Sequence, residues 1–413
     1  MQEVAVLSIG QSQAYRYPLG YNTWDEEEVA AATACLESRM TTMWTKTEAF
    51  EAQFAQYVGA KHAVMVNSGS SADLVTMLAL RESGILQRGD EILIPAVTWP
   101  TQVWSAIEAG FSVKLVDVKT STLNTTAEIL EAAVTPKTKA VFLVHLMGNP
   151  CDMDAVGELC QRKGLLLLED CCEALGASYD GRKVGTFGFA GTFSFFASHH
   201  ISTMEGGMVV TDNADFADAC RLMRAHGWAR DLKHRNGDID VLARYGSHED
   251  PRYLFLGMGF NFRPTELSAE IGRVQLRKLD TMNAHRNRNA AVIHDRFRVT
   301  NGHFIQHLTP VWKAEPAWFA LPFVLREGLP YTREQVCAYL KGYGIDTRPI
   351  VGGNLARHPA FWKYRDIAAG PLTGADEVHD RGFYIGVPPV ECSMDAIIGT
   401  LNAVDSNLRF ICA

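Results

Sequence analysis

Short apolar runs alternate with longer amphipathic segments over most of the chain. The apolar runs have the length of β-strands, whereas the amphipathic segments repeat apolar residues every three or four positions, which predicts helices. Strands that alternate with helices of this length indicate βαβ units and a mostly parallel sheet. The predicted strands are 63–66, 91–94, 113–116, 140–145 and 165–169, and the predicted helices are 25–39, 47–58, 71–81, 101–109, 127–134, 153–163 and 267–282.

The same pattern divides the chain into three parts. We expect an extended N-terminal arm over residues 1–25, a large α/β domain over 26–289 and a smaller C-terminal α/β domain over 290–413. Residues 226–259 are polar and contain glycine, which predicts a long loop of the kind that often carries function. Ligands of open parallel sheets bind at the carboxyl ends of the strands, so candidate site residues should lie just past those ends.

Composition narrows the class of protein. The chain has 413 residues and a net charge of −8 without a basic block, which argues against nucleic-acid binding. It contains neither a continuous apolar run of about 18 residues nor a secretory leader pattern, so no membrane partner is expected. The nine cysteines are scattered, which fits reduced thiols in a cytoplasmic protein and predicts no metal or iron–sulfur site.

Two segments carry candidate anion and ring contacts. Residues 67–72 follow a strand and open a helix, so the backbone N–H groups of Gly69 and Ser70 can hold a phosphate, with Ser194 as a further hydroxyl. A plain turn with a helix cap remains the alternative. Asp170 ends an apolar strand, where a carboxylate can pair with a protonated pyridine nitrogen or can cap the next turn.

Four further residues have side chains suited to a cofactor or an anionic substrate. Glu173 lies one short turn after Asp170 and can sit near the same ring. Trp99 follows a predicted strand and can stack on a ring, or it can pack in the protein. Arg230 and Arg348 carry guanidinium forks that suit carboxylates and phosphates, although each alone equally fits a solvated surface charge.

His199 stands between Ser194 and a Glu205-Gly206-Gly207 turn. An imidazole moves protons near neutral pH, but it has no primary amine and forms no Schiff base. We expect His199 to act as a base, and its neighbour His200 to serve orientation or packing.

Together these segments resemble the DegT/DnrJ/EryC1/StrS family of sugar aminotransferases over residues 17–401. The resemblance implies the aspartate aminotransferase-like fold type I of pyridoxal-phosphate enzymes, with a mostly parallel central sheet and a smaller C-terminal α/β domain. The segments that carry it are Ser68-Gly69-Ser70, Gly89-Asp90-Glu91-Ile92-Leu93-Ile94-Pro95, Glu169-Asp170-Cys171-Cys172-Glu173-Ala174, Thr192-Phe193-Ser194-Phe195-Phe196, Glu205-Gly206-Gly207 and Gly259-Phe260-Asn261-Phe262-Arg263.

The chain departs from this family at one position, because His199 stands where the aminotransferases carry their cofactor-binding lysine. With Ser198 and His200 it is similar to the 3-dehydratase branch, which implies an untethered pyridoxamine phosphate. That branch removes the C3 hydroxyl of a nucleotide-linked 4-keto-6-deoxy sugar, releases ammonia and reloads its cofactor from glutamate. One subgroup adds a [2Fe–2S] cluster, but residues 227–259 contain no cysteine. The resemblance therefore favours the cluster-free type that acts on a GDP-4-keto-6-deoxymannose-like sugar, as in colitose formation.

The resemblance also implies the site roles. It places active sites at the interface of a homodimer, with Asn261 reaching the phosphate of the neighbouring subunit. The remaining implied roles are phosphate binding by Gly69, Ser70 and Ser194, ring stacking by Trp99, nitrogen pairing by Asp170 and proton transfer by His199. Two alternatives stay open: an aminotransferase that uses another lysine, with Lys183 and Lys233 nearest in sequence, and a non-catalytic pyridoxal-binding protein.

Overall fold

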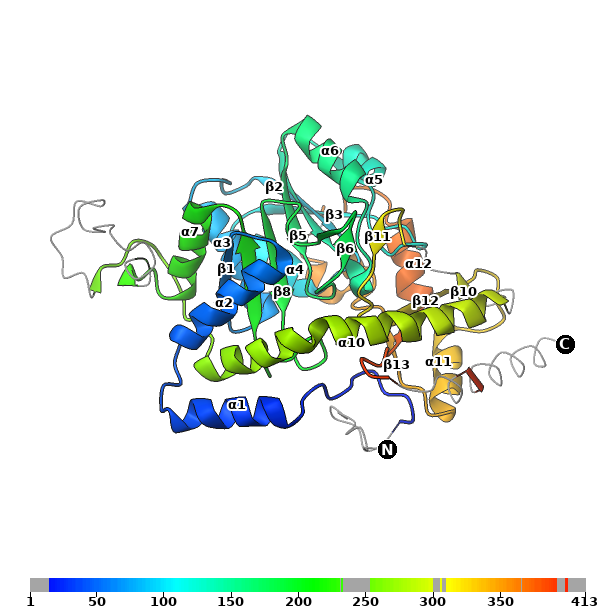
Figure 1. The fold of residues 1–413 in the computed structure, drawn as a ribbon. Helices are drawn as coiled ribbons and strands as arrows, with labels where there is room; N and C mark the ends of the chain where they lie inside the picture. The colour runs from blue at the N-terminus through cyan, green and yellow to red at the C-terminus, as the bar shows by residue number, and fades with distance from the viewer. Residues whose placement is uncertain are drawn as a thin grey trace.

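The computed structural model describes residues 15–230, 232, 253–299, 305–306, 310–364, 366–391 and 398–399. A seven-stranded sheet forms the centre of the molecule, in the order β1-β9-β8-β5-β4-β2-β3 (Figure 1). Neighbouring strands from β8 to β3 are parallel, whereas β9 is antiparallel to both β1 and β8. The strands are β1 (His62–Val66), β2 (Glu91–Pro95), β3 (Ser112–Val116), β4 (Thr138–Val144), β5 (Leu166–Asp170), β8 (Ala190–Ser194) and β9 (Gly207–Thr211).

Helices on both sides of this sheet connect its strands, which confirms the predicted α/β class. Each predicted strand and helix of the first 170 residues is present, with ends shifted by a few residues at most. The local signals explain this agreement: Asp25 forms a capping box with Glu28, and Asp152 caps α6. The helices up to residue 224 are α1 (Glu26–Glu37), α2 (Thr45–Val58), α3 (Gly69–Glu82), α4 (Pro100–Glu108), α5 (Ala127–Ala133), α6 (Met153–Lys163) and α7 (Ala214–Arg224).

Helix α10 is longer than its sequence pattern predicts. The periodicity indicates a helix over 267–282, but α10 runs from Glu266 to Val299 and crosses the lower part of the molecule in Figure 1. Its first half packs in the core beneath α2, whereas Ala290 and Ile293 pack against Trp318 and Leu321 in a second core. Because much of the second half is exposed and polar, its apolar repeat is too sparse to recognise from sequence. The predicted boundary at residue 290 therefore falls inside one continuous helix, and the domain division stays a prediction.

A second sheet follows α10, in the order β10-β12-β14-β13. All its pairings are antiparallel. A further small sheet, β11-β6-β7, links residue 314 to the segment after β5. The later elements are β6 (Ser178–Tyr179), β7 (Arg182–Lys183), β10 (Ile305–Gln306), β11 (Ala314–Glu315), β12 (Leu321–Leu325), α11 (Arg333–Gly342), β13 (Thr347–Pro349), α12 (Thr373–Arg381) and β14 (Gly382–Ile385).

Two of the sequence expectations concern segments that the structure covers only in part. Most of the loop predicted at 226–259 and the first part of the N-terminal arm lie outside the described residues. Among the described residues, no helix combines the length and the apolar character needed to cross a membrane.

A buried ion pair joins α7, α2 and β1. The Arg224 guanidinium on α7 donates to Glu51 Oε1 on α2 at 2.7 Å and to the Met65 carbonyl on β1 at 2.8 Å. Glu51 Oε1 also accepts the Met65 backbone N–H at 2.8 Å. Both side chains are almost completely buried, so the loss of one partner leaves a charge that water does not reach.

We predict that Arg224→Met lowers the free energy of unfolding by about 3–5 kcal/mol, because Glu51 is then buried without its cation. Denaturant unfolding would measure the loss. The matched control is Arg277→Met, which breaks an exposed pair with Glu27 and should cost at most about 1 kcal/mol. Equal losses in the free energy of unfolding of the two variants would show that the buried pair contributes no more to stability than the exposed pair.

Candidate active site

A cavity of about 540 Å³ opens at the carboxyl ends of β4, β5 and β8, and residues of the second sheet form part of its wall. Open parallel sheets hold ligands at this edge. The structure thus gathers most of the predicted site residues in one place. Those that line the cavity are Gly69, Ser70, Trp99, Asp170, Glu173, Ser194, His199 and Arg348.

The N-terminus of α3 forms one wall of the cavity. Ser68 caps this helix by accepting the Ser71 N–H at 3.1 Å, which leaves the first-turn N–H groups at Gly69 and Ser70 facing the cavity side. A Cβ on Gly69 would lie 2.5 Å from the Ser194 Cβ, so only glycine lets the helix approach β8 this closely. The helix dipole, the two N–H groups and the Ser194 hydroxyl together suit a phosphate.

Asp170 lies at the end of β5 and is 3% exposed. Its Oδ1 accepts the Cys172 N–H at 2.9 Å. Burial raises the pKa of this carboxyl, and among the described residues no lysine or arginine forms an ion pair with it. A buried acid without a cation that faces a cavity fits a ligand bearing its own positive charge, such as a protonated pyridine nitrogen.

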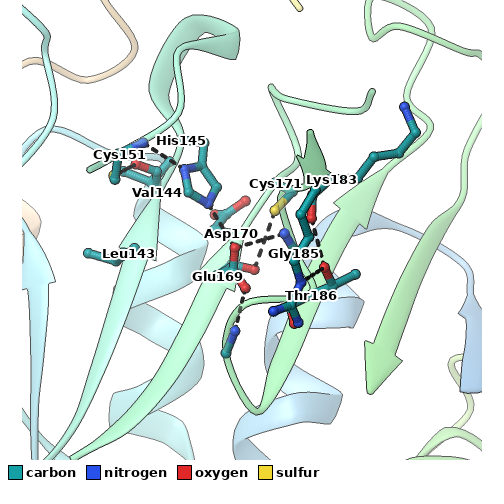
Figure 2. A network of polar contacts seen from close by, with 12 residues as sticks. Leu143, Val144, His145, Cys151, Glu169, Asp170, Cys171, Lys183, Gly185 and Thr186 are labelled. Carbon is teal, nitrogen blue, oxygen red and sulfur yellow. Dashed lines mark hydrogen bonds and ion pairs between the residues drawn. The ribbon is translucent and has the colours of Figure 1, made fainter. Parts of the chain in front are cut away.

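A buried network beneath the cavity holds the end of β5 in place (Figure 2). The Cys151 N–H donates to His145 Nδ1 at 3.1 Å, so the proton of this imidazole is on Nε2, which donates to Glu169 Oε2 at 3.1 Å. Glu169 also accepts the N–H groups of Gly185 and Gly188, at 2.8 and 2.6 Å. The His145 backbone N–H donates to the Asp170 carbonyl at 3.0 Å, which ties this network to the site.

The same network contains the one group of potential metal ligands found among the described residues. Single ligand atoms of His145, Glu169 and Cys171 lie within 4.8 Å of one another. Both oxygens of Glu169 and both nitrogens of His145 already take part in hydrogen bonds within the protein. The ligand atoms of His145 and Glu169 therefore already form the hydrogen bonds that hold the end of β5.

His199 forms the part of the cavity wall that can exchange protons. Its Nδ1 lies 2.6 Å from the Cys172 carbonyl oxygen. A carbonyl only accepts, so Nδ1 carries the proton and Nε2 keeps its lone pair. Burial lowers the pKa of His199 to about 4, partly offset by the Cys172 hydrogen bond. The imidazole is therefore neutral at pH 7 and available as a base.

His200 is not part of the cavity wall and is 1% exposed. Its Nε2 lies 2.9 Å from the Ala317 carbonyl oxygen, and its Nδ1 is buried without a hydrogen-bond partner. This histidine thereby joins the 317–319 segment to the residues that follow β8. The ring of Phe319 in that segment lies 5.2 Å from the His199 ring, between centroids, and closes the cavity beside it. The structure therefore separates a histidine at the cavity from a histidine used for packing.

Sequence reasoning did not single out several of the cavity residues, among them Asp73, Phe319 and Tyr384. Asp73, one turn into α3, is 2% exposed and accepts the Thr192 hydroxyl at 2.8 Å. Its burial, and then the nearby Asp170, raise its pKa well above the usual range. Its place one helical turn after Gly69 was a usable signal. Phe319 and Tyr384 come from the second sheet region, and nothing in their local sequence indicates a site.

Trp99 and Arg348 lie on the cavity wall from opposite parts of the chain. Trp99 precedes α4 and is 57% exposed, so its indole face is available for stacking. Arg348 on β13 donates from one nitrogen to Asp346 Oδ1 at 2.9 Å, which orients the guanidinium and leaves other N–H groups for an anion.

Some predicted residues do not reach this cavity within one chain. The Arg230 guanidinium lies 4.0 Å above the Trp228 ring, outside the cavity wall. Asn261 Oδ1 accepts the Arg263 Nε–H at 3.0 Å and is also outside the wall. No described lysine lines the cavity: Lys183 lies over the Tyr57 ring, and Lys233 is outside the described residues.

Comparison with known proteins gives a consistent result. Residues 22–397 match the DegT/DnrJ/EryC1/StrS aminotransferase family. The chain is 38% identical to GDP-4-keto-6-deoxy-D-mannose 3-dehydratase of Yersinia pseudotuberculosis, over 91% of this chain and 95% of that protein. The E. coli GDP-4-keto-6-deoxy-D-mannose-3-dehydratase with bound hydrated PLP superimposes with a TM-score of 0.87 at 36% identity, covering 95% and 100% of the two chains. A variant of such a dehydratase with bound GDP-perosamine gives 0.86 at 37% identity, covering 94% and 100%.

We predict that the His199 imidazole titrates near pH 4 and is the Nδ1–H tautomer at pH 7, because its neutral form is favoured by burial. Nitrogen-15 NMR of histidine-labelled protein, with His199→Asn for assignment, would measure both properties. A midpoint near the ordinary value of about 6.5 would contradict the prediction.

Proposed function

The chain belongs to the DegT/DnrJ/EryC1/StrS aminotransferase family, and from this we propose that it is a coenzyme B6-dependent sugar 3-dehydratase. It has the fold type I of this family. Its reaction removes the C3 hydroxyl of a nucleotide-linked 4-keto-6-deoxy sugar, and GDP-4-keto-6-deoxymannose is the substrate that the similarity favours. The observation that carries this proposal is His199, a neutral base at a cavity wall where the described residues include no lysine.

The cavity residues suit pyridoxamine 5'-phosphate in detail. Gly69, Ser70 and Ser194 would hold the phosphate, Trp99 would cover the ring and Asp170 would pair with the ring nitrogen. The burial of Asp170 without a lysine or arginine partner among the described residues is the feature that fits this cofactor best, because a pyridinium would supply a positive charge beside it. The bound cofactor would supply a primary amine for the C4 ketone and a ring that accepts electrons as the C3–O bond breaks.

His199 performs the proton transfer that this chemistry requires. The Cys172 carbonyl holds Nδ1–H, so Nε2 accepts the proton removed next to the amine. A lysine at this position would bond covalently to the cofactor, whereas an imidazole has no primary amine and forms no such bond. Glutamate is the proposed amino donor. Arg348 is placed to bind a carboxylate or a nucleotide phosphate in the cavity. Deoxysugar biosynthesis is the proposed process, and a cytoplasmic location stays a prediction.

We propose a homodimer with active sites at its interface. Tyr253, Phe255, Met258 and Phe260 are all more than half exposed and immediately precede Asn261. Exposed apolar groups of this density are typical of interaction surfaces. Asn261 is not part of the cavity wall of its own chain, so in the proposed dimer it would contact the cavity of the second subunit.

The test of the proposed function is incubation with glutamate and GDP-4-keto-6-deoxymannose in the presence of pyridoxal phosphate. The expected products are 2-oxoglutarate, ammonia and a 3-deoxy ketosugar. Amino transfer to the sugar without loss of the C3 hydroxyl would identify an aminotransferase instead. The absence of turnover with every nucleotide-linked ketosugar would favour a non-catalytic binding protein.

We predict that His199→Lys forms a covalent, borohydride-reducible bond to the cofactor and loses dehydration by about 10²-fold or more, because the base is replaced by an amine. Peptide mass mapping after reduction would locate the bond. Wild-type protein treated in the same way is the control and should show no modified lysine. Undiminished dehydration in the variant would show that another group is the base.

We predict that two inactive variants, His199→Asn and Asn261→Ala, complement each other when they are refolded together. Half of the randomly formed dimers are mixed, and each mixed dimer has one intact site, so activity should reach about one quarter of the wild-type value. Each variant refolded alone is the control. A mixture as inactive as its components would show that both residues act within the same subunit.

A further inference from the structure

Glu173 is a titratable cavity group to which the proposed reaction gives no chemical step. It follows Cys172, whose carbonyl holds the His199 imidazole, so one short turn carries both the contact that orients the base and this carboxyl. The Ala174 N–H donates to the Cys171 carbonyl at 2.9 Å and closes that turn. Glu173 and His199 therefore line the same cavity, and the turn that carries Glu173 also contacts the His199 imidazole.

The protein holds one oxygen of Glu173 and leaves the other for the cavity. Glu173 Oε2 accepts the Met147 N–H at 2.9 Å, and no described residue donates to Oε1. Met147 has φ +55°, a left-handed conformation that costs free energy in a residue other than glycine. This conformation is maintained because the Phe319 N–H donates to the Met147 carbonyl at 3.1 Å. The backbone strain thus lies at the residue that positions Glu173.

The surroundings of Glu173 favour a carboxyl group that keeps its proton. No arginine or lysine of the described residues pairs with it; the groups that act on it are Asp170, which repels its anion, and the Met147 N–H, which stabilises that anion. Tyr384 faces it from β14 and stays protonated, because burial raises the pKa of the phenol to about 12. Burial raises the pKa of Glu173 itself to about 7, whereas that of His199 is lowered to about 4.

Two titratable groups of one cavity thus have pKa values displaced in opposite directions, which is how acid and base roles are divided in enzymes. We propose that Glu173 is the general acid that protonates the departing C3 hydroxyl, while His199 acts only as the base. This inference rests on the proposed function. It separates the two proton transfers that a single histidine would otherwise perform in succession.

The proton balance of the step is complete. His199 Nε2 takes one proton from the carbon next to the amine. The C3–O bond breaks, oxygen keeps the bonding pair, and the Glu173 carboxyl gives that oxygen its proton, so that water leaves. His199 then holds one proton more and Glu173 one fewer, and passage of a proton from the imidazolium to the carboxylate restores both groups.

The first test is the pH dependence of dehydration. The wild-type rate should fall above pH 7 as Glu173 loses its proton, and it should fall towards pH 4 as His199 gains one. Glu173→Gln should lower the rate by about 10²–10³-fold and remove the alkaline limb. Glu173→Asp keeps an acid and should retain that limb with a smaller loss. The matched control is Glu205→Gln, a carboxyl-to-amide change on the same cavity wall, in which the alkaline limb should persist.

A substrate whose leaving group needs no proton provides the second test. A 3-fluoro analogue of the sugar releases fluoride, so Glu173→Gln should be impaired with it by less than about 10-fold. The reloading of the cofactor by glutamate involves no departing hydroxyl, and it should stay within about threefold of the wild-type rate. Equal losses in dehydration, fluoride release and reloading would overturn the proposal and assign Glu173 to cofactor binding alone.

A third measurement is independent of turnover. Infrared spectra of the protein should contain a protonated-carboxyl band that titrates near pH 7 in the wild type and is absent from Glu173→Gln. Absence of this band from the wild type would also overturn the proposal. Failure of wild-type protein to dehydrate the sugar would instead contradict the proposed function, while the infrared titration would still report on Glu173.

Discussion

The hydrogen bond from His199 Nδ1 to the Cys172 carbonyl is the contact on which the chemistry of this protein depends. It decides which imidazole nitrogen carries the proton, and it leaves Nε2 as the acceptor of a ring that lines the cavity. Burial of the ring then keeps it neutral. Without this contact the same imidazole could adopt either tautomer. The sequence alone then indicates that the lysine is lost, but it does not indicate which nitrogen of His199 accepts a proton.

That contact depends on the end of β5. The turn that supplies the Cys172 carbonyl also carries Asp170 and Glu173, so the proposed partner of the ring nitrogen, the proposed acid and the support of the proposed base share a few consecutive residues. Beneath them, Glu169 binds two backbone N–H groups and the His145 imidazole (Figure 2). A fully hydrogen-bonded carboxylate inside the core gives the strand end a single arrangement, because any displacement would leave polar groups unpaired.

The two sheets contribute different residues to the cavity wall. The parallel sheet supplies the helix N-terminus at Gly69 and the acids at the strand ends. The second sheet and the segment before it supply Phe319, Arg348 and Tyr384, which complete the wall. His200 and Met147 are both bonded to the 317–319 segment, so the packing of that segment and the geometry of the acid and base are connected through backbone hydrogen bonds.

The sequence by itself determined the alternating α/β architecture, the turn before α3 that we propose binds phosphate, and the strand end at Asp170, because these rest on local periodicity, capping and short spacings. It also marked His199 as a base without an amine. The tertiary structure decided which histidine faces the cavity, since His199 and His200 are neighbours and only their packing differs. It also brought in Asp73, Phe319 and Tyr384, left Arg230 outside and extended α10 across two cores. These outcomes depend on contacts between residues far apart in the chain, which a local pattern does not encode.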